Sequence, residues 1–199
     1  MRVLLPNKSL EPTATPFQGE ARILFQASSS SGGGSAFYVR PDMHAITKSE
    51  ACAWCLAHNI ALDERQLPQP DFTDKHGHDF KIPGDTGRRV ALLSHLFRSI
   101  PTDQEVLLWF SEWGVWPSSE RPHMFERFRA SYGEHRPLAD APAFIFSPAE
   151  REDLISFAGF AMLFLWDCHV LSATGDTWLF LSHDEIGWIC SHKYVTNPV

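Results

Sequence analysis

Apolar residues recur at helical spacing in four segments of the chain, and each segment begins or ends at a recognisable signal. Thr47 and Glu50 are spaced as a capping box, in which a hydroxyl and a carboxylate satisfy opposed backbone donors. Ser147, Pro148 and Glu150 form a second start signal. The predicted helices run from Thr47 to about His58, from Asp85 to Ile100, from about Ser118 to Gly133 and from Ser147 to about Gly159. We expect their buried faces to include Ala51, Cys52, Cys55 and Leu56; Val90, Leu93, Phe97 and Ile100; and Met124, Phe125 and Phe128.

Apolar runs between these helices predict strands. They lie at Ala36–Val39, Glu105–Phe110, Ala143–Phe146, Leu163–Leu171 and Thr177–Ser182, and Ile186–Cys190 is either a further strand or a short closing helix. The turn residues from Ser172 to Asp176 make a C-terminal β-hairpin, whereas Asp63 to Gly84 predicts a long polar loop. Helices and strands mix without a regular βαβ rhythm. The sequence therefore predicts an α+β fold with a mainly antiparallel sheet and about four helices.

The first 34 residues differ from the rest of the chain. They hold three prolines and a serine- and glycine-rich tract, Ser28–Ser35, and such sequence buries nothing. We expect residues 1–34 to be a disordered leader and residues 35–199 to form a single globular domain.

The leader sequence Leu4-Leu5-Pro6-Asn7-Lys8-Ser9-Leu10-Glu11-Pro12-Thr13-Ala14 resembles read-through of the recombination sites that flank integron gene cassettes. This resemblance covers about a dozen residues and implies a mobile bacterial gene. The C-terminal half also resembles uncharacterised bacterial proteins with a WDCH…SHDE pattern, and that likeness implies no particular function.

Composition narrows the function classes. The 199 residues are 44% hydrophobic, enough for one sizeable core, and the net charge of −7 argues against a nucleic-acid partner. Four cysteines show no disulfide framework, and because the first residues lack a long apolar region we expect no secretory signal. The longest apolar run, Phe157–Trp166, is about half of a membrane span. We therefore expect a cytoplasmic protein that does not enter the membrane.

The C-terminal hairpin carries the most informative candidate site. A three-residue loop, Thr174-Gly175-Asp176, would pair Ala173 with Thr177 and place Asp167 opposite His183. Under that register Asp167, His169, His183 and Glu185 share one face, and Trp166, Cys168, Val170, Trp178 and Phe180 form the core face. Two histidines and two carboxylates can bind a metal or hold an acid–base pair. The alternative is an ordinary Asp–His surface pair, with Ser182–Glu185 as the capping box of a closing helix.

A second candidate is the C-x-x-C pair, Cys52 and Cys55. With His58, His76 and His78 it could supply four zinc ligands, but its spacing matches no closed zinc motif and it lies inside a helix. Buried cysteines on an apolar helix face are the preferred interpretation.

The leading functional hypothesis is a small bacterial accessory protein that binds another protein, in an immunity- or antitoxin-like role. It rests on acidic charge, many aromatic residues and the lack of a known catalytic motif. The alternative is a metal-dependent or His/carboxylate acid–base enzyme that uses Asp167, His169, His183 and Glu185. The sequence does not identify a cofactor or metal.

Overall fold

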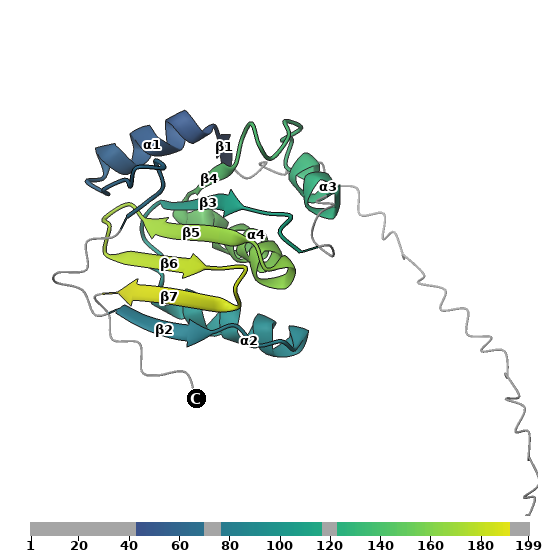
Figure 1. Ribbon diagram of the computed structural model, residues 1–199. Helices are drawn as coiled ribbons and strands as arrows, with labels where there is room; N and C mark the ends of the chain where they lie inside the picture. The colour runs from purple at the N-terminus through teal and green to yellow at the C-terminus, as the bar shows by residue number, and fades with distance from the viewer. Residues whose placement is uncertain (1–42, 70–76, 117–122, 192–199) are drawn as a thin grey trace, which may run out of the picture. The chain divides into compact units, whose positions relative to one another are not determined.

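Seven antiparallel strands form one sheet in the order β1-β4-β3-β5-β6-β7-β2 (Figure 1). The computed structural model describes residues 43–69, 77–116 and 123–191, so the predicted leader and the predicted strand at residues 36–39 lie outside the described residues. The strands are β1 (His44–Ile46), β2 (Gly77–Lys81), β3 (Val106–Glu112), β4 (Ala143–Phe146), β5 (Asp167–Ser172), β6 (Thr177–Leu181) and β7 (Ile186–Ser191). The predicted α+β class and antiparallel sheet are confirmed.

Four helices accompany the sheet. They are α1 (Lys48–Ala57), α2 (Thr86–Leu96), α3 (His123–Ser131) and α4 (Arg151–Phe164), with short 3-10 turns at Phe97–Ser99 and Pro148–Glu150. Both predicted capping boxes form: Glu50 accepts from the Thr47 backbone N–H at 2.7 Å, and Glu150 accepts from that of Ser147 at 2.8 Å. In the described part of the chain, no helix is both long and apolar enough to cross a bilayer.

Three helix residues that we expected to be buried are exposed: Leu56, Val90 and Met124. Each helix buries fewer of its apolar side chains than the sequence pattern predicts, because only one side of the helix faces the sheet. In α1 the buried large side chain is Trp54 in place of Leu56.

The edge strand β2 lies inside the segment predicted to be a polar loop. Its residues are mostly exposed, so no apolar pattern marks it, and its strand conformation comes from pairing with β7. Gly77 is required there, because a Cβ atom would lie 2.0 Å from the Trp188 ring.

The two faces of the sheet differ in how they are covered. The larger core lies between one face and α2, α3 and α4, and it contains Leu108, Phe144, Phe157 and Val170. On the other face, α1 packs Trp54 and Cys55 against Leu107, Trp109 and Leu171. In Figure 1, α1 lies near the β1–β4–β3 end of the sheet, away from β6, β7 and β2.

The predicted face assignment of the C-terminal hairpin is wrong for two residues. Cys168 pairs with Leu181 and His169 with Phe180, one residue off the expected register. Trp178 and Phe180 therefore lie on the face of His169, and Leu179 and Leu181 fill the core beside Cys168 and Val170. The loop has four residues because the Ala173 N–H bonds to the carbonyl of Glu105 and not across the hairpin.

Candidate functional site

Asp167 and His183 form a hydrogen-bonded pair at the end of the C-terminal strands. The Asp167 Oδ1 atom accepts from the His183 backbone N–H at 2.6 Å and lies 2.8 Å from His183 Nδ1. His183 follows the end of β6 in a tight connection to β7, where Glu185 has a φ of 60° and Ser182 N–H bonds to the Ile186 carbonyl. Of the two alternatives for the following segment, the strand forms, as β7, and the closing helix does not; a turn before it presents His183 to Asp167.

A β-bulge brings a third ligand-type side chain to this pair. Strand β3 pairs regularly with β5 up to Phe110 and Cys168, and then shifts by one residue so that Glu112 lies opposite Asp167. A bulge changes the direction of the side chains that follow it. It places Glu112 on the same face of the sheet as Asp167, whereas regular alternation would place Glu112 on the opposite face. Ligand-type atoms of Glu112, Asp167 and His183 all lie within 4.8 Å of one another.

The charges in this cluster are poorly balanced. Two carboxylates face each other across neighbouring strands, an arrangement that like-charge repulsion destabilises. Among the residues that the structure describes, no lysine or arginine forms an ion pair with either of them, and His183 is the single basic partner. A bound proton or metal cation would relieve the repulsion.

The pKa of His183 reflects these neighbours. Partial burial, the largest single effect, lowers it, but the hydrogen bond to Asp167 and the charges of Asp167, Asp184 and Glu112 together raise it above its ordinary value. The raised pKa favours the protonated imidazole, whose Nδ1–H then lies between the ring and the Asp167 carboxylate.

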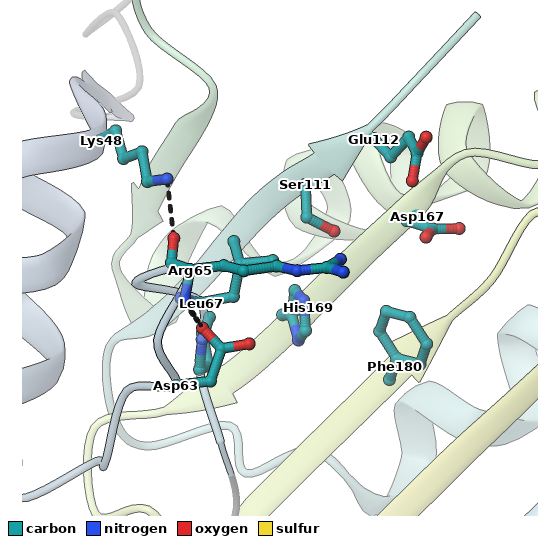
Figure 2. Close-up of a pocket in the computed structure, with 10 residues that line it drawn as sticks. Lys48, Asp63, Arg65, Leu67, Ser111, Glu112, Asp167, His169 and Phe180 are labelled. Carbon is teal, nitrogen blue, oxygen red and sulfur yellow. Dashed lines mark hydrogen bonds between the residues drawn. The ribbon is translucent and has the colours of Figure 1, made fainter. Parts of the chain in front are cut away.

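A pocket of about 390 Å³ adjoins the cluster on the α1 face of the sheet (Figure 2). Its floor comes from β3, β5 and β6, and its side comes from the start of α1 and the loop after it. The lining residues are Lys48, Asp63, Arg65, Leu67, Pro68, Ser111, Glu112, Asp167, His169 and Phe180.

The loop wall of this pocket is held by Asp63. Its Oδ1 atom accepts from the backbone N–H groups of Arg65 and Leu67, both at 2.8 Å, and Lys48 Nζ donates to the Arg65 carbonyl at 2.9 Å. The Arg65 side chain is exposed and extends from this wall toward the strands in Figure 2.

His169 lies in the pocket floor and is 6% exposed. The indole N–H of Trp178 donates to His169 Nδ1 at 3.2 Å; the imidazole lies parallel to the Trp178 ring, and the Phe180 ring packs against it at a tilt of 36°. Burial lowers the pKa of His169 to about 3, and the charge of Asp63 raises it only in part. The ring is therefore neutral, and with Nδ1 acting as acceptor its proton resides on Nε2.

The structure brings together three of the four predicted site residues. Asp167 and His183 are in direct contact, and His169 lines the adjoining pocket. Glu185 lies apart, with its carboxylate 3.7 Å from Arg89. Glu112 does not stand out in the sequence as a site residue, because the bulge that redirects its side chain leaves no mark in the strand pattern.

The cysteine pair is not part of a ligand cluster among the described residues. Cys55 is buried, Cys52 lies near the Gln66 carbonyl, and His58 Nδ1 lies 2.7 Å from the Trp54 carbonyl. His76 lies outside the described residues. In the part of the chain that the structure describes, Glu112, Asp167 and His183 are the one group of three metal-ligating side chains at this range.

Comparisons of the chain with known protein families, with curated proteins and with solved structures find no match.

Proposed function

We propose that the protein is a metal-dependent enzyme whose metal centre is formed by Glu112, Asp167 and His183. The observation that carries the proposal is the meeting of two carboxylates and an imidazole within 4.8 Å, with no described lysine or arginine in an ion pair with either carboxylate. Compared with the site predicted from the hairpin alone, the proposed metal centre gains Glu112 and loses Glu185, and His169 lies beside it in the pocket.

The donor set favours a transition metal. Mixed imidazole and carboxylate ligands suit Zn²⁺ or Mn²⁺ better than Mg²⁺ or Ca²⁺, which prefer oxygen throughout. The 2.8 Å between His183 Nδ1 and Asp167 Oδ1 resembles the spacing of two adjacent ligands on one zinc ion, roughly 3 Å apart. The cation would replace the proton that these two atoms share.

Three protein ligands are typical of a catalytic site and not of a structural one. Structural zinc sites are closed by four protein ligands, whereas catalytic sites keep a position for water or substrate. A metal at this cluster would border the pocket, because Glu112 and Asp167 belong to both. It would lower the pKa of a bound water and polarise a ligand oxygen.

Calorimetric titration with Zn²⁺ and Mn²⁺ tests the proposal. We expect one metal ion per chain for the wild type and loss of that binding in Glu112→Gln and in Asp167→Asn. Glu185→Gln is the matched control, because it removes a nearby carboxylate that pairs with Arg89 outside the cluster. Absence of stoichiometric binding by the wild type, or equal binding by Glu112→Gln, overturns the metal centre.

The protein-binding role, the cytoplasmic location and the cassette origin stay predictions from the sequence. The geometry adds support for a small-ligand site, and the described contacts add none for a partner interface.

A further inference from the structure

His169 offers a hydrogen-bond donor that no described residue uses. Its Nδ1 atom accepts from the Trp178 indole, so the neutral ring carries its hydrogen on Nε2. Nε2 is buried and has no hydrogen-bond partner among the described residues. A buried polar group without a partner costs about 1–3 kcal/mol, so native proteins seldom keep one without a reason.

The position of this donor points to a ligand. His169 lines the same pocket as the metal-ligating carboxylates of Glu112 and Asp167. Arg65 is exposed, and its guanidinium makes no hydrogen bond to any described residue. Figure 2 shows Arg65 extending from the loop wall toward the strands. Because His169 Nε2 is itself buried, a ligand reaches it only when a lining side chain such as Arg65 moves aside.

The charge of the lining sets the ligand class. Lys48 and Arg65 contribute two positive charges, against three carboxylates from Asp63, Glu112 and Asp167. The metal-free pocket is therefore net negative and repels anions. A divalent cation reverses the sign, and the pocket then offers the cation, the Arg65 guanidinium and the His169 N–H to one ligand.

We infer that the metal-loaded pocket binds a small molecule bearing a phosphate or carboxylate group, with one oxygen accepting from His169 Nε2–H. This inference rests on the proposed metal centre and adds the chemical class of its substrate. His169 acts here as a fixed donor that positions the ligand.

Two substitutions of His169 separate the donor from the packing. Asn places its amide oxygen near the former Nδ1 and can still accept from Trp178, but it lacks the donor at Nε2. Gln places an amide N–H near the former Nε2 and keeps the donor. Both remove the aromatic ring, and they lose opposite hydrogen bonds: His169→Asn loses the Nε2 donor, whereas His169→Gln loses the acceptor for Trp178. Weaker ligand binding in His169→Asn than in His169→Gln therefore identifies the donor as the group that binds the ligand.

The experiment titrates methyl phosphate, and separately acetate, into protein loaded with one equivalent of Zn²⁺. A Zn²⁺ titration of each variant first reports whether its metal centre is intact. We expect wild type and His169→Gln to bind within about threefold of each other, and His169→Asn to bind about tenfold more weakly. The ¹⁵N shift of His169 Nε2 should move on binding. Tighter binding of methyl phosphate assigns a phosphate-bearing substrate, and tighter binding of acetate a carboxylate-bearing one.

Three results overturn the inference. Equal binding by His169→Asn and the wild type removes His169 from the site, while the metal centre stands. Binding of neither anion to Zn²⁺-loaded protein removes the substrate class, again without touching the metal centre. Failure of the wild type to bind Zn²⁺ at all removes the proposed function and this inference together.

Discussion

Replacing His169 should change how the stability of the metal-free protein depends on pH. The ring is buried beside Trp178 and Phe180, and burial holds its pKa at about 3 against an ordinary value of 6.5. In the unfolded chain the His169 ring would bind a proton near pH 6.5, whereas in the folded protein it would bind one only near pH 3. The contribution of His169 to the free energy of unfolding is therefore constant above pH 6.5 and decreases as the pH falls below that value.

The size of this effect follows from the two pKa values. One pKa unit corresponds to about 1.4 kcal/mol of differential interaction. At pH 5, one and a half units below the unfolded pKa, the free energy of unfolding should have fallen by about 2 kcal/mol because of His169 alone. At pH 3, where the folded ring is itself half protonated, the loss would be about 4 kcal/mol, although carboxylates that titrate near pH 4 then contribute as well.

Urea unfolding at pH 8 and pH 5, with a chelator present, measures the difference. His169→Asn is the comparison variant, because it cannot titrate and keeps an acceptor for the Trp178 N–H. We expect the wild type to lose about 2 kcal/mol more than this variant between the two pH values. His183, whose raised pKa makes its contribution grow as the pH falls, is common to both proteins and cancels.

Two observations would refute this account of His169. One is an equal pH dependence for the wild type and His169→Asn. The other is an NMR titration in which the His169 Cε1–H resonance moves with a midpoint near 6.5, which would mean that the ring is accessible to water in the folded protein.

Four further predictions concern single sites. Asp167→Ala should cost about 3 kcal/mol in urea unfolding because two hydrogen bonds to His183 are lost, whereas Asp167→Asn should cost about 1 kcal/mol or less; equal losses would contradict this. Zn²⁺ affinity should rise from pH 6 to pH 8, because the raised pKa of His183 makes its proton compete with the metal, and a pH-independent affinity in calorimetry would exclude His183 as a ligand. A thiol reagent at pH 8 should label Cys52 before Cys55, whose pKa burial raises to about 12; simultaneous labelling would show that α1 opens. Thr47→Ala should cost about 1 kcal/mol in unfolding and Thr47→Ser almost nothing, and equal costs would remove the capping box as the cause.

Local signals were sufficient for most of the fold. The two capping boxes and Asp85 begin helices where the pattern expects them, and β4 occupies the predicted residues Ala143–Phe146. These features depend on neighbours within four residues in the chain. The edge strand β2 could not be found in this way, because its conformation depends on pairing with β7, about 110 residues further along.

The register of the hairpin shows the same limit. Turn residues indicate a loop between Leu171 and Thr177, but they do not say whether Ala173 belongs to the loop or to the ladder. Ala173 leaves the ladder with β6 because its N–H bonds to the Glu105 carbonyl on the other side. That contact comes from β3, and nothing within the hairpin sequence encodes it.

The contact between Asp167 and His183 forms in spite of the incorrect register. With the register observed, Asp167 lies level with Ser182 and not with His183, and continued alternation along β6 would point His183 toward the opposite face. The strand ends at Leu181, however, so alternation no longer constrains His183, and the Asp167 carboxylate binds both its backbone N–H and its ring. The bulge at the end of β3 frees Glu112 from alternation in the same way. All three side chains of the proposed metal centre thus lie where regular strand structure stops, and it is this loss of regularity that lets carboxylates from two adjacent strands and a turn histidine converge on one point.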